Sequence, residues 1–142
     1  MEKLRARLLR AATNLHQAIF RATNGRVTGR VAGMPVVMLT TTGRKSGKPY
    51  TTMLTSPIQD GDQIVLVASY GGSPRHPIWF LNLRDHPAVE VVMRGRAGPM
   101  RARVASAAER AALWPRVVQA YQGYAAYQQK TTREIPLVIV AP

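Results

Sequence analysis

The sequence predicts a mainly β domain of the α+β class, an antiparallel barrel of about six strands with inserted helices. Two observations favour this class. From residue 36 onward, short runs rich in β-branched residues alternate with turns that contain glycine. The connections between these runs are too short for the crossover helices of a parallel sheet, so neighbouring strands should be antiparallel.

The first expected element is an amphipathic helix over residues 2–22. Its apolar positions recur every three or four residues, at Leu4, Leu8, Leu9, Ala12, Leu15 and Ile19. Arginines lie on the other side of this pattern. Such a helix either docks on the core or lies on an anionic membrane surface, and both alternatives remain open. Three glycines between residues 23 and 33 indicate a linker.

Six strands are expected after this linker, and two tight turns set their pairing. The strands span about 36–42, 50–57, 63–69, 88–94, 99–106 and 136–140. The turn at 59–62 joins the second strand to the third, and the turn at 95–98 joins the fourth to the fifth. Both turns predict antiparallel hairpins.

Three helical patterns lie among these strands. They run from after Pro74 or Pro77 to Arg84, over about 106–121, and over about 123–130. Ser106 is followed three residues later by Glu109, which predicts a capping box at the start of the second of these helices.

Composition limits the function classes. The chain has 142 residues and no cysteine, which excludes disulfides, thiolate chemistry and iron–sulfur clusters. A net charge of +13 favours a polyanionic partner: nucleic acid, anionic lipid or an anionic small molecule. No run approaches the roughly 18 apolar residues of a membrane span. Because no signal peptide is evident either, we expect a cytoplasmic protein with a helix and linker at 1–33 and a barrel domain at 34–142.

The turn between the first two strands carries the strongest functional signal. It contains three cations, a hydroxyl and two glycines: Gly43, Arg44, Lys45, Ser46, Gly47 and Lys48. Glycine lets backbone N–H groups approach a ligand closely. We expect this turn to bind phosphate or carboxylate oxygens, although basic turns also occur as solvated hairpin tips. Its spacing differs from that of a Walker A loop, which precedes a helix.

A second ligand-facing stretch follows the third strand. That strand ends at Ser69, and a Gly-Gly pair then leads to a helix N-terminus with unpaired N–H groups. The alternative is a simple strand-to-helix connection. On the helix, Trp79 and Asn82 share one face. Trp79 packs in the core or against a cofactor, and Asn82 bonds either a buried backbone group or a ligand.

Three tyrosines occur three residues apart, at Tyr121, Tyr124 and Tyr127. On one regular helix they would cover a single side, but Gly123 favours a break between the first and second. They form either an aromatic pocket wall or ordinary packing, and buried tyrosine must satisfy its hydroxyl.

Residue sets for hydrolysis or metal catalysis are not evident. The three histidines lack metal-ligand spacing, and the seven carboxylates make no convincing pair. An enzyme of this kind would obtain its chemistry from a bound cofactor.

Six sequence blocks then occur in one order. They are Thr41–Pro49, Val67–Gly72, His76–Leu83, Leu113–Pro115, Tyr121–Tyr127 and Ile135–Val138. From about residue 35 to the C-terminus, the chain resembles the deazaflavin-dependent nitroreductase family of actinobacteria. The resemblance implies a split β-barrel of the FMN-binding type and coenzyme F420, an 8-hydroxy-5-deazaflavin, as cofactor. It also implies hydride transfer to a quinone, an enone or other activated alkene, or incidentally a nitroaromatic.

The resemblance further implies roles for single residues. The phosphate and oligoglutamate tail of the coenzyme would lie on Thr42, Gly43, Arg44, Lys45, Ser46, Gly47 and Lys48. The deazaflavin ring would lie along Ala68, Ser69, Tyr70 and Gly71, and Trp79 and Asn82 would support the pocket. The expected catalytic residues are Ser69, Tyr121, Tyr124 and Tyr127, of which the tyrosines close the acceptor pocket.

Two positions depart from the family pattern. Tyr50 stands where the binding turn usually continues with arginine, and Thr55 stands where the nitroreductase has a tyrosine near the acceptor. We therefore expect quinone or enone reduction rather than nitroimidazole reduction.

Two alternatives remain open at this point. One is a split-barrel reductase that binds FMN. The other is a non-catalytic basic protein that binds a polyanion or a membrane surface, although 6% aromatic residues and the lack of a known module argue against nucleic acid. A further possibility, compatible with the F420-dependent reductase, is that the helix at 2–22 binds lipid and holds the enzyme at the inner face of the cell membrane.

Overall fold

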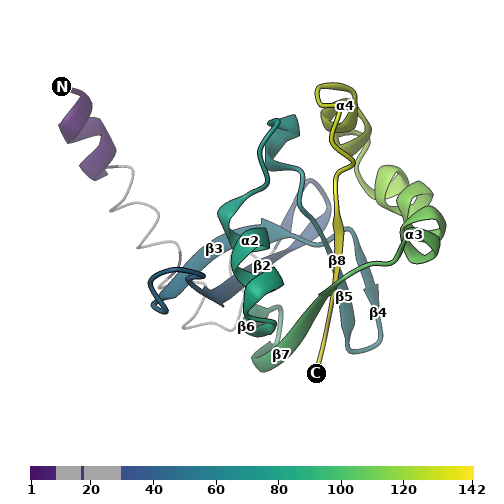
Figure 1. Cartoon of the computed structure of the whole chain (residues 1–142), viewed down its shortest axis with the longest axis horizontal. Helices are drawn as coiled ribbons and strands as arrows, with labels where there is room; N and C mark the ends of the chain where they lie inside the picture. The colour runs from purple at the N-terminus through teal and green to yellow at the C-terminus, as the bar shows by residue number, and fades with distance from the viewer. Residues whose placement is uncertain (9–16, 18–29) are drawn as a thin grey trace.

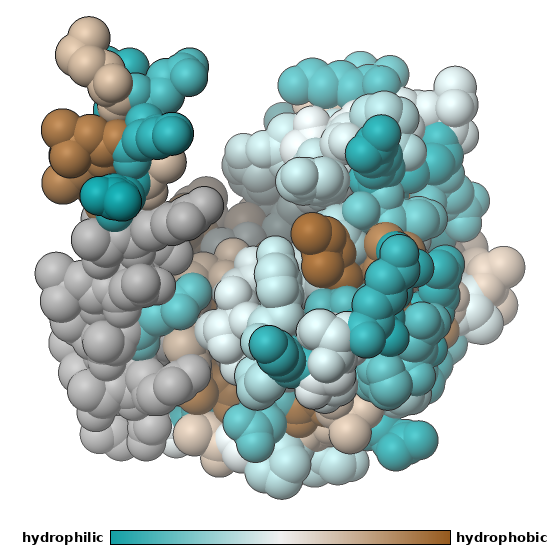
Figure 2. All heavy atoms as spheres, turned by 60° about the vertical axis from the view of Figure 1, so that its left-hand side comes forward, coloured by the Kyte–Doolittle hydropathy of each residue, from teal (hydrophilic) through white to brown (hydrophobic). Residues whose placement is uncertain are grey.

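The computed structural model describes residues 1–8, 17 and 30–142 (Figure 1). Residues 2–8 are helical, as the N-terminal pattern predicts, and residue 17 is helical too. The rest of that predicted helix lies outside the described residues. The first helix carries hydrophobic side chains on one side and hydrophilic ones on the other (Figure 2). In the part of the chain that the structure describes, no helix is long and apolar enough to cross a membrane.

A curled antiparallel sheet forms the body of the molecule. Its strands are β1 (Arg30–Val31), β2 (Met34–Thr42), β3 (Pro49–Thr55), β4 (Ile58–Asp60), β5 (Gln63–Val67), β6 (Ala88–Met93), β7 (Arg96–Val104) and β8 (Leu137–Ala141). The order across the sheet is β1-β2-β6-β7-β8-β5-β4, and β3 also pairs with β2. Among the described residues no backbone ladder joins β3 to β5, so the barrel is split there. The predicted split barrel is confirmed.

The predicted strand at 50–57 is in fact two strands, because the chain turns a corner at Ser56 and Pro57. The Ser56 side chain is fully buried, and its hydroxyl lies 2.8 Å from the carbonyl oxygen of Val65 and 2.9 Å from that of Ile58. The Ser56 N–H donates to the carbonyl oxygen of Pro35 over 3.0 Å. This corner therefore links β3 to β5 through a side chain where no ladder does.

Two predicted connections also differ from the structure. The segment 95–98, predicted as a turn, belongs mostly to β7, because Arg96 already pairs with Met93. The predicted linker at 23–33 contains β1 in its described part, which pairs with the start of β2. In both hairpins two residues suffice for the turn, since Gly95, Ala32 and Gly33 have positive φ.

The helices of the barrel domain agree with the predicted ones. They are α2 (Ile78–Asp85), α3 (Ala107–Ala120) and α4 (Gly123–Gln129), with a short 3₁₀ turn η1 (Tyr70–Gly72) after β5. The capping box is confirmed: the Ser106 side chain accepts from the N–H of Glu109, whose carboxylate accepts from the N–H of Ser106. Arg103 donates to the same carboxylate, and these bonds lower the pKa of Glu109 to about 2.

The core has two layers, which lie on opposite faces of β5 and β8. Ile64 and Leu66 face the barrel interior and pack with Trp79 of α2. Val65 and Val67 face the other layer, which α3 and α4 cover (Figure 1). Burial on both faces explains why these two strands have uninterrupted apolar sequences. Strand β5 lies between the two layers, and the segment that follows it, η1, packs against α4.

Candidate active site

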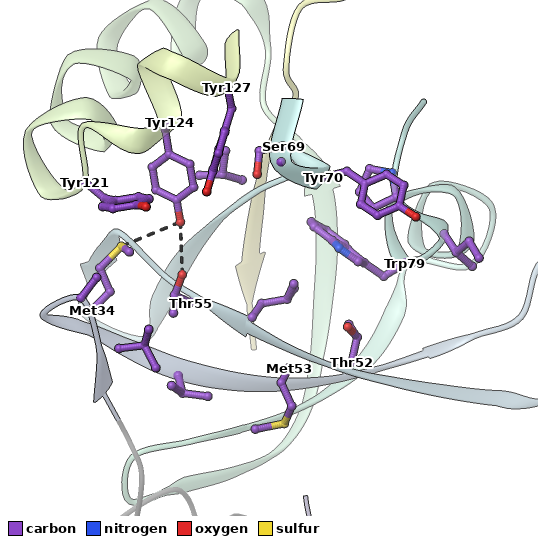
Figure 3. A pocket seen from close by; sticks show the side chains of 18 of the residues that line it. Met34, Thr52, Met53, Thr55, Ser69, Tyr70, Trp79, Tyr121, Tyr124 and Tyr127 are labelled. Atoms are coloured by element: carbon purple, nitrogen blue, oxygen red, sulfur yellow. Dashed lines mark hydrogen bonds between the residues drawn. The ribbon is translucent and has the colours of Figure 1, made fainter. Parts of the chain in front are cut away.

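A pocket of about 590 Å³ opens where the barrel is split. Strand β3, the segment after β5, the start of α2 and the tyrosines around α4 line it (Figure 3). Its described lining includes Thr52, Thr55, Ser69, Tyr50, Tyr70, Trp79, Tyr121, Tyr124 and Tyr127. Neither a charged side chain nor a histidine occurs among these described lining residues. The polar side chains of the pocket wall are therefore hydroxyls and the indole.

The three tyrosines converge in spite of a helix break. Helix α3 ends at Ala120 and α4 begins at Gly123, so Tyr121 lies outside both helices. Even so, the ring centroids of Tyr121 and Tyr124 are 5.2 Å apart, and those of Tyr121 and Tyr127 are 6.4 Å apart. A Cβ at position 123 would collide with the Tyr121 ring. Glycine is thus required there for Tyr121 to fold back beside the other two rings.

The Tyr124 hydroxyl is held across the split. It lies 3.2 Å from the Thr55 hydroxyl on β3 and 3.8 Å from the Met34 sulfur (Figure 3). Burial raises the pKa of Tyr124, and the hydrogen bond to Thr55 lowers it in part. The neighbouring Tyr127 raises the pKa of Tyr121. Both phenols therefore stay protonated at neutral pH and can donate hydrogen bonds.

The loop after β5 adopts an unusual backbone. Tyr70, Gly71 and Gly72 have φ of +46°, +62° and +82°. A Cβ on Gly72 would lie 2.6 Å from the carbonyl oxygen of Tyr127, so only glycine lets this loop approach α4 so closely. The loop brings Ser69 into the pocket wall and leaves Tyr70, another lining residue, 61% exposed.

Trp79 and Asn82 share one face of α2 but have different surroundings. Trp79 is buried and lines the pocket. Asn82 is buried too, and its side chain donates to the Thr41 hydroxyl over 3.1 Å and accepts from the N–H of Arg44 over 3.0 Å. The amide of Asn82 thus binds the basic turn rather than lining the pocket. Because Trp79 and Asn82 are one helical turn apart, α2 connects the pocket wall to the basic turn.

The basic turn is closed by its own backbone. Gly43 donates to the carbonyl oxygen of Lys48 over 2.8 Å, and Gly47 donates to that of Gly43 over 2.9 Å. The Ser46 hydroxyl accepts from the N–H of Lys48 over 3.2 Å. The side chains of Arg44, Lys45 and Lys48 are exposed, and none forms an ion pair with a described residue. The turn therefore presents three uncompensated cations to solvent.

The structure brings part of the predicted site into one pocket wall. Seven of them line the pocket: Ser69, Tyr70, Gly71, Trp79, Tyr121, Tyr124 and Tyr127. Asn82 and the residues from Thr42 to Lys48 lie outside its described lining, and Ala68 is buried behind it.

Two features of the site were not predicted from the sequence: Arg133, which binds the loop after β5, and the hydrogen bond between Thr55 and Tyr124. No local signal marks either, because each contact joins residues more than 60 positions apart.

Comparisons with known proteins agree on one family. A family model described as F420H(2)-dependent quinone reductase matches residues 12–142. An F420H(2)-dependent quinone reductase of Mycobacterium tuberculosis (strain H37Rv) is 41% identical over 134 residues, which cover 89% of this chain and 87% of that protein. A putative F420H(2)-dependent quinone reductase of Mycobacterium bovis matches equally well. The solved structure of an F420-H2 dependent reductase, FDR-A, is 42% identical with a TM-score of 0.67, and the match covers 75% of this chain and 93% of that one.

The fold is that of a split-barrel oxidoreductase. The chain belongs to the F420H(2)-dependent quinone reductase family, and its cofactor is coenzyme F420. The FMN alternative finds no support.

Proposed function

We propose that this enzyme reduces a quinone, or an enone of similar shape, in the tyrosine-lined pocket. One observation carries the proposal: an uncharged pocket wall rich in hydroxyl donors lies one helix turn away from a cationic turn. A quinone is neutral, and it takes up a hydride and a proton to become a hydroquinone. Negative charge develops on its oxygen as the hydride arrives, before the proton neutralises it, and hydroxyl donors stabilise this charge best.

The basic turn fits the anionic tail of coenzyme F420. Its three cations are exposed, and no carboxylate of the described residues competes for them. The Ser46 hydroxyl accepts a hydrogen bond within the turn, so its own proton is left to donate to a phosphate oxygen. The N–H groups of Lys45 and Ser46 also donate to no other described residue. We therefore assign the tail to residues Thr42–Lys48.

The pocket wall fits the ring and the acceptor. When bound, the reduced coenzyme supplies a hydride. Trp79 offers a flat aromatic surface, and the backbone of Ser69, Tyr70 and Gly71 can lie close to a ring. Together they would orient the ring. The hydroxyls of Tyr121 and Tyr127 are not tied to β3, unlike that of Tyr124, and we assign them the role of hydrogen-bond donors to the acceptor oxygen. The proton comes from a tyrosine or from water.

We also propose that the enzyme acts in the cytoplasm at the inner face of the membrane, where apolar quinones dissolve. Leu4 and Leu8 are each 62% exposed, and Lys3, Arg5 and Arg7 lie on the same short helix. Such a helix suits an anionic lipid surface. Deletion of residues 1–8 should weaken co-sedimentation with anionic vesicles, and unchanged binding would contradict this location.

The test of the function is a fluorescence titration with F420 and, in parallel, with FMN. Saturable binding of F420 alone is expected, followed by oxidation of the reduced coenzyme when menadione is added. Tyr127→Phe should keep coenzyme binding and slow menadione reduction. A preference for FMN, or binding of F420 without any transfer to quinone or enone, would refute the proposal.

A further inference from the structure

Arg133 places its guanidinium group against the loop that follows β5. Its Nε donates to the carbonyl oxygen of Ser73 over 2.9 Å, its Nη1 to that of Ala68 over 3.1 Å, and its Nη2 to that of Ser69 over 2.8 Å. The side chain is partly buried, and burial lowers its pKa. Among the described residues no carboxylate pairs with it. Three carbonyl oxygens of one loop thus converge on a single cation.

The backbone of this loop needs such support. Ser69 is right-handed helical, and the next three residues have positive φ. That conformation costs free energy for Tyr70, because its Cβ crowds the following carbonyl. It also turns carbonyl oxygens toward one another, and their negative ends repel. A planar guanidinium with five donors offsets this repulsion in a way that a single N–H cannot.

Arg133 itself is well anchored. Its carbonyl oxygen accepts from the side-chain amide of Gln128 on α4, and its N–H donates to the Thr131 hydroxyl. The cation is therefore fixed relative to α4, the helix that carries Tyr124 and Tyr127. Arg133 thus connects two walls of the pocket, the tyrosines and the loop.

The opposite side of the same peptide groups faces away from Arg133. A trans peptide points its N–H away from its C=O, so the N–H groups of Ser69 and Tyr70 point away from the cation. The N–H groups of Ser69, Tyr70 and Gly71 donate to no other described residue. A right-handed residue followed by left-handed ones gathers such N–H groups into a concave arrangement that binds oxygen anions. All three residues line the pocket.

We propose that Arg133 is a positioning residue for the coenzyme. It holds the loop so that the N–H groups of Ser69, Tyr70 and Gly71 are presented together to an oxygen of the deazaflavin ring. Its hydrogen bonds also polarise two of these peptide groups, which strengthens their N–H donors. The inference rests on the proposed function, which lays the ring along this loop.

Arg110 offers a matched control. It is also a partly buried arginine of the C-terminal region, and it donates to the carbonyl oxygen of Ile135 over 2.9 Å and to the Gln128 side chain over 3.2 Å. It makes no hydrogen bond to the loop at 68–73. Gln128 also binds the carbonyl oxygen of Arg133, so loss of Arg110 should loosen the segment that carries Arg133 while leaving the three hydrogen bonds from the Arg133 guanidinium to the loop in place.

The experiment compares R133M, R133K and R110M in the full-length protein. Three quantities are measured: the melting temperature, the Kd for F420 by fluorescence, and hydrogen exchange at the amides of Gly72 and Ser73. These two amides donate within the loop, to the carbonyl oxygens of Ser69 and Tyr70. R133M should weaken F420 binding about tenfold or more and accelerate exchange at both amides. R110M should lower the melting temperature and leave the Kd within about twofold.

R133K keeps the charge but lacks the planar fork, so an intermediate Kd is expected. It also replaces R133M if that variant does not fold. Wild-type affinity in R133M or R133K, or an equal loss in R110M, would overturn the positioning role. Failure of the wild-type protein to bind F420 would instead refute the proposed function, and exchange at Gly72 and Ser73 would still report whether Arg133 holds the loop.

Discussion

Two glycine-containing connections are the proposed contacts of the coenzyme, and different interactions hold them in place. The basic turn at 43–48 is closed mainly by hydrogen bonds between its own residues. The loop at 68–73 is held instead by hydrogen bonds from Arg133 and by close packing against α4. Arg133 lies more than 60 positions after Ala68 and Ser69, two of the residues it binds. The turn contributes charge, whereas the loop contributes shape and oriented donors.

Because of this difference, substitutions in the two regions should have different effects on stability and on F420 binding. Exposed cations act through charge that salt screens, and their loss costs little stability. The loop at 68–73 packs against α4, so its disruption should lower both the free energy of unfolding and the affinity for F420. The following variants test that contrast.

The largest effect is expected from a pair of glycine substitutions. In G72A, the positive φ and the new Cβ, 2.6 Å from the Tyr127 carbonyl oxygen, force the loop away from α4. We expect a loss of about 3 kcal/mol of unfolding free energy and a weaker F420 complex. In G43A, the new Cβ meets the Ser46 hydroxyl, which can rotate away, and lies 3.2 Å from the Lys48 carbonyl oxygen, so the loss should be smaller, about 1 kcal/mol. Thermal unfolding measures both, and equal losses would contradict the contrast.

The double variant K45A/K48A tests the turn by itself. It should weaken F420 binding about tenfold or more at low salt, since charge-assisted hydrogen bonds are lost. The melting temperature should not change, and the remaining affinity should depend less on salt. A double change at two other exposed arginines that pair with no described carboxylate, R94A/R101A, serves as the charge-matched control. Equal weakening by both pairs would show that overall charge acts rather than this turn.

Thr55→Val tests the connection across the split. Tyr124 loses its hydroxyl partner on β3, which should cost about 1 kcal/mol and raise the pKa of Tyr124 further, because the bond to Thr55 lowers it. Ultraviolet titration of tyrosinate reports the pKa, and denaturant unfolding reports the stability. Thr52→Val removes another hydroxyl from the pocket lining, and it should leave the pKa of Tyr124 unchanged.

The smallest effect concerns His76, whose Nδ1 lies 3.4 Å from Nη1 of Arg133 and whose ring packs on Phe80. Burial, with the charges of Arg133 and Arg84, lowers the pKa of His76 below its ordinary 6.5. The unfolded chain therefore binds this proton first, and the free energy of unfolding should fall as the pH drops below about 6.5, then level off below the folded pKa. H76N accepts the same hydrogen bond without titrating, so it should remove this pH dependence. A slope that persists in H76N would exclude His76 as its source.

Much of the fold could be predicted from the sequence. Alternation of β-branched runs and turns gave the antiparallel strands, and Ser106 with Glu109 gave the start of α3. Strand ends were less predictable. Ser56 divides a predicted strand because its side chain binds β5, a contact that no local pattern contains.

The candidate site also has features that local sequence predicts and features that it does not. The cations and glycines of residues 43–48 are contiguous, so their order along the chain is enough to predict a turn that attracts an anion. Three other features of the site depend on the folded chain. They are the hydrogen bond between Thr55 and Tyr124, the hydrogen bond between Asn82 and the basic turn, and the three carbonyl oxygens that bind Arg133. Composition and local propensity depend on neighbours along the chain, whereas hydrogen bonds and packing depend on neighbours in space. Only the curled sheet brings residues from β3, η1, α2 and α4 around one pocket.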